Sequence, residues 1–261
     1  MCWSCEGKSV NELVSIIVPV YNVEGLICET MDCVLAQTWQ CWELLLVEDG
    51  SSDGTIQVIK MYMEEKGDER IRLICQPRNL GAARARNRGL SEALGRYIAY
   101  LDSDDLWEPE KLEKELAFMK ETGAAFVFTG YEFADQNGQG TGKVVRVPRT
   151  LTYRQALSNT TIFTSTVMFD MEKTGRELLE MPQIKSEDTA LWWKVLRSGY
   201  NAWGLDENLV RYRRSKGSLS ANKLEALRRI WNLYRRAEGL SIPVSMGHFC
   251  LWAVRAVKRR V

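Results

Sequence analysis

Residues Gly95–Asp105 read GRYIAYLDSDD, an apolar run that ends in a cluster of carboxylates. The run Arg96–Leu101 is rich in aromatic and aliphatic side chains, which is typical of a buried strand. This strand would deliver Asp102, Asp104 and Asp105 together to one place in the fold. Because like charges repel at such short separations, the loop is expected to face a cation.

Three similar apolar runs precede this strand, and helical patterns separate them. The expected strands are Val14–Val20, Trp42–Val47 and Arg70–Gln76, and the expected helices are Leu26–Gln37, Ile56–Lys66 and Ala82–Leu94. Strands that alternate with helices predict an α/β fold with a Rossmann-like, mostly parallel sheet flanked by helices. Ligands of such sheets bind beyond the carboxyl ends of the strands, so the loops at those ends are the candidate site.

The second half of the chain is less regular. The elements expected there are a helix over Glu110–Thr122, a strand over Ala124–Glu132, a turn over Asp135–Gly142, a helix from Ser186 to Gly199, and basic amphipathic helices over Leu224–Glu238 and Met246–Arg260. We therefore expect an N-terminal tail (1–13), a catalytic domain (14–220) and a C-terminal basic helical extension (221–261).

Composition and charge narrow the class of protein. The chain is 45% hydrophobic and 26% charged, as folded proteins are. It has no apolar run of the length that spans a bilayer, so no transmembrane helix is expected. Its first residues have no long apolar core, so no signal peptide is expected. Residues 211–261 carry 13 Lys and Arg against two Glu, whereas residues 1–210 have a net charge of −10. The basic end predicts an anionic surface as partner.

The seven cysteines favour free thiols over a metal site. Cys2 and Cys5 have a zinc-like spacing, but no second pair follows and His248 is the only histidine. A structural zinc site needs four ligands. Reduced thiols in a cytosolic protein are therefore expected.

The acidic loop suits a hard cation. Mg²⁺ and Mn²⁺ are held by one or two carboxylates together with substrate phosphates. Asp102 and Asp104 are two residues apart, so on an extended chain both face one side and could share a metal ion and the sugar of a nucleotide. The alternative is a solvated acidic turn in which Asp104 or Asp105 caps the next helix.

Loops after the other strands add groups that could bind a nucleotide. Asp49 follows a strand directly and could accept hydrogen bonds from a base or a ribose; helix capping, the alternative, fits Asp53 better. Pro19 and Tyr21 could form an apolar wall for a base, or Tyr21 could simply pack in the core.

A helix start follows the third strand. Arg84 and Arg86 lie there, where guanidinium groups and backbone N–H groups could both face an anion. The alternative is a solvated basic face, which is the interpretation we prefer for Arg88.

Five stretches, in this order and at these separations, resemble glycosyltransferase family 2. They are VSIIVPVYN (14–22), VEDGSSDGT (47–55), NLGAARARNRGL (79–90), GRYIAYLDSDD (95–105) and SEDTALWWKVLRSG (186–199), and the resemblance covers residues 14–220. Two further stretches, LDSDDLWEPEKLEKELAFMKETG (101–123) and VRYRRSKGSLSANK (210–223), are similar to the bacterial branch that builds cell-surface polysaccharides, including teichuronic-acid-type enzymes.

The resemblance implies a GT-A fold, a nucleotide-sugar donor (a UDP-sugar), a divalent metal ion (Mn²⁺ or Mg²⁺) and inversion at the anomeric carbon. The implied donor nucleotide-binding residues are Pro19, Val20, Tyr21, Glu24, Asp49, Gly81, Arg84, Asp102 and Ser103. Asp104, with Asp102, would hold the metal. One departure is Glu48, which stands where the family usually has a first aspartate before Asp49, and it leaves the base preference open.

Glu187 and Asp188 supply the remaining chemistry. The resemblance implies that Asp188 is the general base for the acceptor hydroxyl, which becomes acidic as its bond to the sugar forms. The alternative is an ordinary helix start with a Ser186 cap and acids in the first turn. Glu187, Trp192 and Trp193 would lie on the acceptor side, although core packing is an equal alternative for a tryptophan.

Two other functions compete with glycosyl transfer. A nucleotidyltransferase would need a glycine-rich basic phosphate loop after the first strand, and residues 19–25 lack one. A catalytically inactive sugar- or lipid-binding scaffold would not need Asp104 and Asp188.

The expected partners follow from this function. They are the nucleotide-sugar donor, a glycan or polyprenyl-linked acceptor and, through the C-terminus, an anionic membrane surface; no nucleic acid is expected, and oligomerisation is left open. The Trp, Leu and Phe content of the basic tail suits a membrane interface, so we expect a cytoplasmic protein on the inner face of the cell membrane. Packing of the tail against the catalytic domain, or against another subunit, is the alternative.

Overall fold

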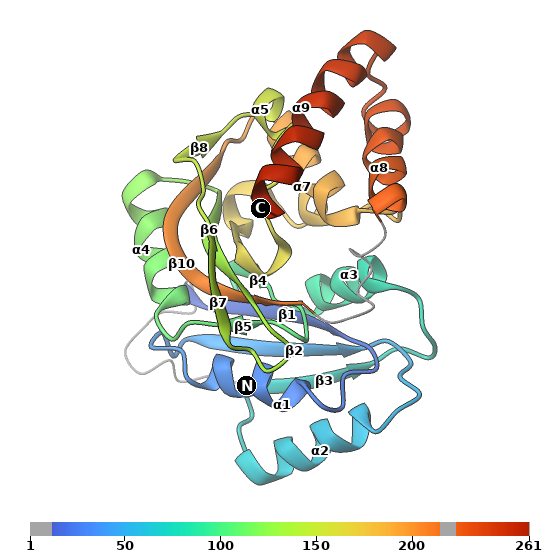
Figure 1. Ribbon diagram of the computed structural model, residues 1–261. Coiled ribbons are helices and arrows are strands. Elements are labelled where there is room, and N and C mark those ends of the chain that lie inside the picture. The colour runs from blue at the N-terminus through green and yellow to red at the C-terminus, as the bar shows by residue number, and fades with distance from the viewer. Residues whose placement is uncertain (1–11, 215–222, 261) are drawn as a thin grey trace.

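A computed structural model describes residues 12–214 and 223–260, and strands alternate with helices through the first half of the chain (Figure 1). The strands are β1 Val14–Val20, β2 Trp42–Glu48, β3 Ile71–Cys75, β4 Tyr97–Tyr100, β5 Leu106–Trp107, β6 Phe126–Ala134, β7 Gly140–Val145, β8 Thr150–Leu151, β9 Val167–Asp170 and β10 Ala202–Arg213. The helices are α1 Ile27–Leu35, α2 Thr55–Lys66, α3 Ala82–Glu92, α4 Lys111–Thr122, α5 Tyr153–Ala156, α6 Met171–Thr174, α7 Glu187–Arg197, α8 Lys223–Asn232 and α9 Ile242–Arg260. Short 3₁₀ turns lie at η2 Thr164–Thr166 and η3 Glu177–Leu179, and η5 Leu233–Ala237 is a π-helical turn.

The strands form one ten-stranded sheet in the order β3-β2-β1-β4-β9-β6-β10-β5, with β7 beside β6 and β8 beside β10. β1 pairs in parallel with β2 and β4, and β2 pairs in parallel with β3. β9 is antiparallel to both β4 and β6 and so joins the two halves. The predicted α/β fold with a central, mostly parallel sheet is confirmed, and the second half adds antiparallel strands to it.

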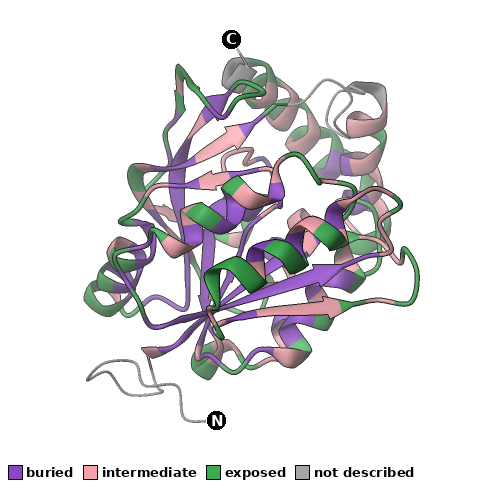
Figure 2. Cartoon of the chain, turned by 90° about the horizontal axis from the view of Figure 1, so that it is seen from below, coloured by how far each residue is buried: buried purple, intermediate pink, exposed green. Residues whose placement is uncertain are grey.

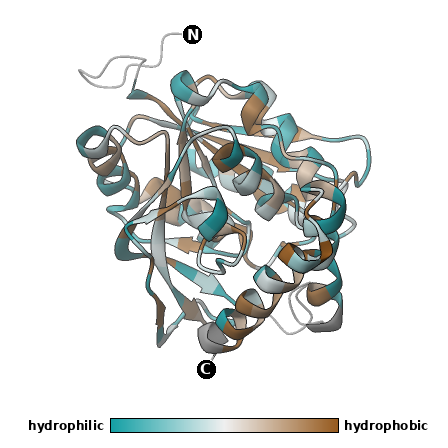
Figure 3. Ribbon diagram, turned by 90° about the horizontal axis from the view of Figure 1, so that it is seen from above, coloured by the Kyte–Doolittle hydropathy of each residue, from teal (hydrophilic) through white to brown (hydrophobic). Residues whose placement is uncertain are grey.

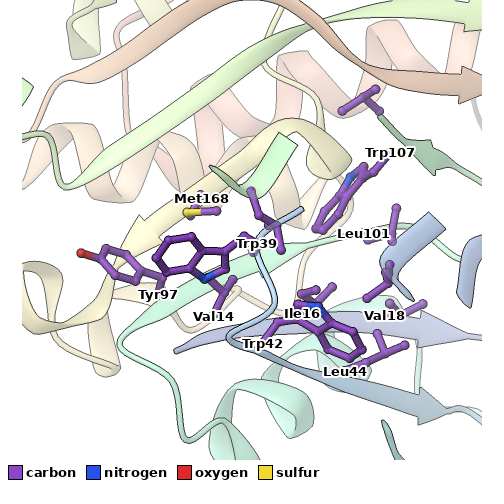
Figure 4. Close-up of a cluster of buried hydrophobic side chains, with 14 of the residues drawn as sticks. Val14, Ile16, Val18, Trp39, Trp42, Leu44, Tyr97, Leu101, Trp107 and Met168 are labelled. Carbon is purple, nitrogen blue, oxygen red and sulfur yellow. The ribbon is translucent and has the colours of Figure 1, made fainter. Parts of the chain in front are cut away.

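Alternating side chains of the central strands feed two cores, one on each face of the sheet. From β1, Ile16 and Val18 belong to one cluster and Ile17 to the other. Helices α1, α2 and α4 cover the first core, part of which Figure 4 shows around Trp42 and Trp107. Helices α3, α7 and α8 cover the second. Figure 2 shows the buried strands between helices whose outer faces are exposed.

The expected elements of the first half match the structure to within a few residues. The turn over Asp135–Gly142 is confirmed as the connection between antiparallel β6 and β7. The helix expected from Ser186 is confirmed as α7, but its start differs. Ser186 has a φ of 61° and its side chain does not cap the helix, so the interpretation of Ser186 as a cap is wrong.

The C-terminal helices share the second core with the catalytic fold. Ile230 and Tyr234, from α8 and η5, belong to the same buried cluster as Trp193 of α7. On α9, Phe249 and Trp252 face inward, and Phe249 meets Trp231 edge-on at 5.7 Å. The predicted boundary at residue 220 lies outside the described residues.

The aromatic residues Phe249 and Trp252 of α9 are partly buried because they pack against the protein. The exposed large hydrophobic side chains of α9 are Ile242, Val244, Met246, Leu251, Val254 and Val257. Figure 3 shows hydrophobic residues along this helix. Among residues 12–214 and 223–260, no helix combines the length and hydropathy that crossing a bilayer requires.

The cysteines depart from expectation at one position. Cys28, Cys33, Cys75 and Cys250 are free, as predicted. Cys41 is disulfide-bonded, so the prediction of free thiols is wrong for it. The Cys2–Cys5 spacing lies outside the described residues.

Candidate active site

The carboxyl ends of three parallel strands lie next to one another in the sheet. Val20, the last residue of β1, lies opposite Glu48, the last residue of β2, while Tyr100 at the end of β4 lies opposite Ile17. The polar loops after these strands therefore follow one another along the edge, which is where the alternating pattern predicted the site.

The loop after β4 includes one structural carboxylate, Asp105. Asp105 is fully buried. Ser165 Oγ donates to its Oδ2 at 2.5 Å, and the backbone N–H of Arg213 donates to its Oδ1 at 3.1 Å. Burial and the neighbouring carboxylates raise the pKa of Asp105 well above its ordinary value. The N-cap position of α4 is Glu110, so the alternative in which Asp104 or Asp105 caps that helix is wrong.

Asp104 faces a cavity instead. It lines a pocket of about 790 Å³ and forms no ion pair with the residues that the structure describes. Burial first, and then the nearby charge of Asp102, raises the pKa of Asp104 to about 6. Asp102 and Asp104 are neighbouring carboxylates, and Asp104 is partly desolvated. A cation bound there would therefore be stabilising.

Arg86 joins the acidic loop to α7. Its Nη2 donates to Asp102 Oδ1 at 2.6 Å and its Nη1 donates to Glu187 Oε1 at 3.0 Å. Burial alone would lower the pKa of the guanidinium, but the two carboxylates raise it, so Arg86 is a permanent cation. The buried Nε has no hydrogen-bond partner among the described residues. Arg86 thus neutralises one side of a carboxylate cluster, while the charge of Arg213 only partly offsets the raised pKa of Asp104.

Helix α3 can place Arg86 there because it lies close to the sheet. A Cβ added at Gly89, one turn further along, would lie 2.5 Å from Ile17 Cγ2 of β1. Gly81, at the N-cap of α3, has a φ of 91°, which favours glycine. These two glycines fix where the helix begins and how closely it packs.

Asp188 lies in the first turn of α7 and lines the same pocket as Asp104. The backbone N–H of Thr189 donates to its Oδ1 at 2.6 Å, and Thr164 Oγ1 donates to its Oδ2 at 3.4 Å. A carboxylate has about four acceptor positions, so Asp188 can still accept a proton from a ligand in the pocket. Glu187 beside it has a raised pKa, first because of burial and then because of Asp188.

The donor chemistry of this cluster fits a divalent cation that arrives with a phosphate ligand. Asp102 and Asp104 offer the oxygen ligands that Mg²⁺ and Mn²⁺ prefer. Within the described part of the chain, no group of three or more His, Cys, Asp or Glu could hold a metal ion. The carboxylate pair therefore suits an ion completed by a donor diphosphate and by water.

Of the predicted nucleotide-binding residues, Asp102 lines this pocket, whereas those of the loops after β1, β2 and β3 do not. Asp49 is buried and accepts three hydrogen bonds from one loop: Gln76 Nε2 and Leu80 N to Oδ1, both at 2.7 Å, and Gly81 N to Oδ2 at 2.8 Å. Asp49 therefore orders the 76–81 loop, and one acceptor position of the carboxylate remains for a base. Glu48 contacts its own loop, since its Oε1 accepts a hydrogen bond from the backbone N–H of Ser51.

The other residues predicted to contact the donor differ in how exposed their side chains are. Tyr21 is 47% exposed, so its ring is available as a wall for a base. Val20 is fully buried in the core, so only its backbone could touch a nucleotide. Glu24 Oε2 accepts the backbone N–H of Gly54 at 2.6 Å. Pro19 is partly exposed.

Two further predicted donor residues behave differently. Arg84 is exposed, and its Nε donates to Gln183 Oε1 at 2.9 Å. Ser103 is buried, and its carbonyl accepts Thr30 Oγ1 at 2.9 Å, which holds the acidic loop against α1.

Both predicted acceptor tryptophans are core residues that also reach the pocket wall. Trp192 stacks on Phe169 with centroids 5.7 Å apart. Trp193 stacks on Tyr234 at 5.2 Å, and its Nε1 donates to the carbonyl of Ala156. Core packing, the alternative for these residues, is the role seen in the structure.

The structure adds pocket residues that sequence reasoning missed. They are Asn159, Thr160, Ile162, Phe163, Thr164, Tyr212, Arg213, Arg229, Trp252 and their neighbours on α8 and α9. They come from segments with no chemical motif. The one available signal was the Arg-rich start of α3, where Arg86 is buried against carboxylates while Arg88 is exposed and pairs with Glu92.

Comparison with solved structures shows that the chain has the GT-A fold. The chain resembles Staphylococcus aureus TarS 1–349 in complex with UDP-GlcNAc, with a TM-score of 0.69 and 20% identity over 92% of this chain and 71% of that one. It also resembles the mannosyltransferase PcManGT from Pyrobaculum calidifontis in complex with GDP-Man and Mn²⁺, with a TM-score of 0.72 and 20% identity over 91% of this chain and 69% of that one.

Sequence comparison then gives the family. The model of glycosyl transferase family 2 matches residues 15–173, so the chain belongs to that family and is a glycosyltransferase. TuaG of Bacillus subtilis (strain 168), provisionally assigned as a teichuronic acid biosynthesis glycosyltransferase, is 44% identical over 95% of this chain and 98% of its own length. The Escherichia coli UDP-Glc:alpha-D-GlcNAc-diphosphoundecaprenol beta-1,3-glucosyltransferase WfgD is 38% identical over 85% of each chain.

Proposed function

We propose that this glycosyltransferase is an inverting, divalent-metal-dependent enzyme of bacterial cell-surface polysaccharide synthesis. It would move a sugar from a UDP-sugar to a hydroxyl of a glycan or lipid-linked acceptor. The observation that carries the proposal is the pocket that Asp104 and Asp188 both line. Asp104 forms no ion pair with the residues that the structure describes, and Asp188 has acceptor capacity left.

Each side of the pocket has one chemical task. Asp188 takes the proton of the acceptor hydroxyl while that oxygen forms a bond to the anomeric carbon of the donor sugar. The bond from the anomeric carbon to the diphosphate breaks, and its electron pair stays with the leaving UDP. Because the attacking oxygen and the leaving group lie on opposite faces of the sugar, the configuration inverts. Mn²⁺ or Mg²⁺ on Asp102 and Asp104 would offset the charge of the leaving diphosphate.

The assignment of residues around the donor follows from their positions along the sheet edge. Pro19, Tyr21 and the free acceptor position of Asp49 would frame the base, with Glu24 beside the ribose. Gly81 and Arg84, at the start of α3, lie in the segment that Asp49 orders. Asp102 and the backbone of Ser103 would lie between ribose and metal.

The relatives support the donor and the acceptor by their names. WfgD is named for transfer from UDP-Glc to a sugar on diphosphoundecaprenol, and TuaG for teichuronic acid biosynthesis. We propose the same classes of substrate here, a UDP-sugar and a polyprenyl-linked or glycan acceptor.

We also propose peripheral association with the cytoplasmic face of the membrane. The support is the apolar side chains that α9 exposes, Met246, Leu251 and Val254, together with the basic residues of 211–261. Apolar side chains in the interface and basic ones on anionic lipid are the composition of an interfacial helix. The proposed catalytic domain spans residues 14–220, after a tail at 1–13, and the helices of 221–261 extend it toward the membrane.

Titration of UDP with and without Mn²⁺ tests the proposal in wild type and in Asp104→Asn. Wild-type protein should bind UDP more tightly with Mn²⁺, and the substitution should abolish that increase. Asp206→Asn is the matched control, because Asp206 is exposed outside the pocket and an amide oxygen can still accept its hydrogen bond from Val147 N. Unchanged metal dependence in Asp104→Asn would overturn the assignment. An inactive scaffold would bind UDP-sugars without hydrolysing any.

A further inference from the structure

The pocket of the candidate active site has two chemically different ends. One end carries the charged groups Arg86, Asp102, Asp104, Glu187, Asp188 and Arg213. The other end is walled by apolar side chains from the C-terminal helices, namely Ala226, Leu227 and Ile230 of α8 and Trp252, Ala253, Ala256 and Val257 of α9. We name this second end the apolar arm. A diphosphate gains no favourable contact from walls that are mostly aliphatic.

Small residues keep the apolar arm open. Ala253 and Ala256 lie one turn apart on α9, on the side that faces the pocket. Earlier on α9, Phe249 and Trp252 stack with their ring centroids 6.2 Å apart. Phe249 also contacts Trp231 of α8, so the two helices are in contact there. The alanines therefore leave a space between helices that larger side chains hold together elsewhere.

The apolar arm opens beside exposed apolar side chains of α9. Val257 lines the pocket and is also 62% exposed, so it lies at the mouth. The adjoining outer face of α9 presents Leu251 and Val254. Between Ser241 and Val257 the only charged residue is Arg255. Its Nη1 donates to the carbonyl of Ser158, which turns it toward the protein. The mouth of the pocket is thus bordered mainly by apolar side chains of α9.

One cation lies within the apolar arm. Arg229 of α8 lines the pocket, and its side chain is 23% exposed. Its Nε pairs with Glu225 Oε1 at 3.3 Å, which leaves most of the five guanidinium N–H donors for an anion. Guanidinium forks suit phosphate oxygens.

We propose that the apolar arm binds the first part of the hydrocarbon chain of a lipid-linked acceptor, with Arg229 at the phosphate that joins lipid to sugar. This rests on the proposed function, since it assigns the acceptor of the same site. The chain would pass from the bilayer, across Val257, between α8 and α9, and so present the acceptor hydroxyl to Asp188. The outer face of α9 would then lie in the membrane because the substrate enters there.

Binding of two prenyl diphosphates tests the proposal without knowledge of the acceptor sugar. Farnesyl diphosphate and dimethylallyl diphosphate share a headgroup and differ in chain length, and saturating UDP with Mn²⁺ blocks the donor position. Wild-type protein should bind farnesyl diphosphate at least about 10- to 20-fold more tightly, a difference of about 1.4–1.8 kcal/mol, which matches about two buried methylenes.

Variants locate the binding. Ala256→Phe, or the milder Ala253→Leu, should remove the preference for the longer chain, whereas Arg229→Gln should weaken both ligands by a similar factor. Val254→Phe is the matched control, because Val254 is on the same helix but outside the pocket. It should keep the wild-type preference.

The outcomes separate this inference from the proposed function. A melting temperature of Ala256→Phe close to that of Val254→Phe shows that the variant is folded. Equal binding of the two prenyl diphosphates by wild type, or a preference that survives both alanine substitutions, would overturn the apolar arm and leave the donor chemistry standing. If the wild-type protein does not bind UDP more tightly with Mn²⁺ than without it, the proposed function itself is refuted.

Discussion

Arg86 offers the most demanding perturbation of the site. Arg86→Met removes a guanidinium that is 6% exposed and contacts Asp102 at 2.6 Å and Glu187 at 3.0 Å. Methionine fills much of the same volume, so the change tests charge more than packing. The two carboxylates would then repel one another in a partly desolvated site.

The magnitude follows from burial. Removing one partner of a fully buried ion pair costs about 3–5 kcal/mol. The side chains of Asp102 and Glu187 are 25% and 22% exposed, so water can rehydrate them in part. We therefore expect a loss of about 2–3 kcal/mol. For a chain of this length that lowers Tm by about 4–12 °C.

Catalysis should fall as well, because Arg86 holds the start of α7 against the acidic loop. A small displacement of a catalytic group can cost about 10²-fold in rate, and we expect a loss of that order. Arg86→Lys should lie between wild type and Arg86→Met, since an ammonium keeps the charge but cannot reach both carboxylates with a planar fork.

Thermal unfolding and donor hydrolysis, measured on the same preparations, check this account. Adding Glu187→Gln to Arg86→Met should restore at least about 1 kcal/mol, because it removes one uncompensated carboxylate and so reveals the coupling. If Arg86→Met unfolds within about 1 °C of wild type and keeps its rate, Arg86 is not the electrostatic bridge that we infer.

Two other perturbations test separate parts of the molecule. Lys111 and Glu115 form a fully buried ion pair, and burial raises the pKa of Glu115 to about 7 despite the opposing charge of Lys111. Lys111→Met should therefore be destabilised by about 3–5 kcal/mol at pH 8 and should recover below pH 5. The reason is that a carboxyl whose folded pKa is raised contributes stability that is lost as pH rises through that pKa. Chemical unfolding from pH 5 to pH 8 measures this, and an equal loss of stability at pH 5 and at pH 8 would contradict it. Replacing Met246, Leu251 and Val254 together by serine should weaken co-sedimentation with anionic vesicles, whereas Met61→Ser, an exposed methionine on α2, should not; vesicle binding that is equal in all three proteins would exclude α9 as the docking surface.

The sequence predicted the first half of the fold well because its strands are continuous apolar runs. The strand Val14–Val20 is buried at nearly every position, and such runs are unlike any helix of the chain. β10 escaped notice for the opposite reason. Its segment Ala202–Arg213 includes Gly204, Asp206 and Asn208, and it pairs with β6 through two register shifts. Only long-range pairing makes that segment a strand.

The site was predicted in part. The carboxylates Asp102, Asp104 and Asp188 were named from motifs, and the pocket brings them together. The burial of Arg86 and the apolar arm could not be predicted, because both depend on how distant segments pack. A guanidinium on an Arg-rich helix and an alanine on a C-terminal helix carry no local sign of what they will face.

The central claim is that Asp188 takes the proton in a sugar transfer within this pocket. Asp188→Asn keeps the shape of the side chain and the hydrogen bond from the backbone of Thr189, but an amide cannot accept the proton. The decisive measurement is the rate of sugar transfer by this variant beside its affinity for UDP with Mn²⁺. We expect unchanged UDP affinity and a rate lower by about 10²–10⁴. Transfer at the wild-type rate would contradict the account, since Asp188 would then be only a first-turn acid of α7.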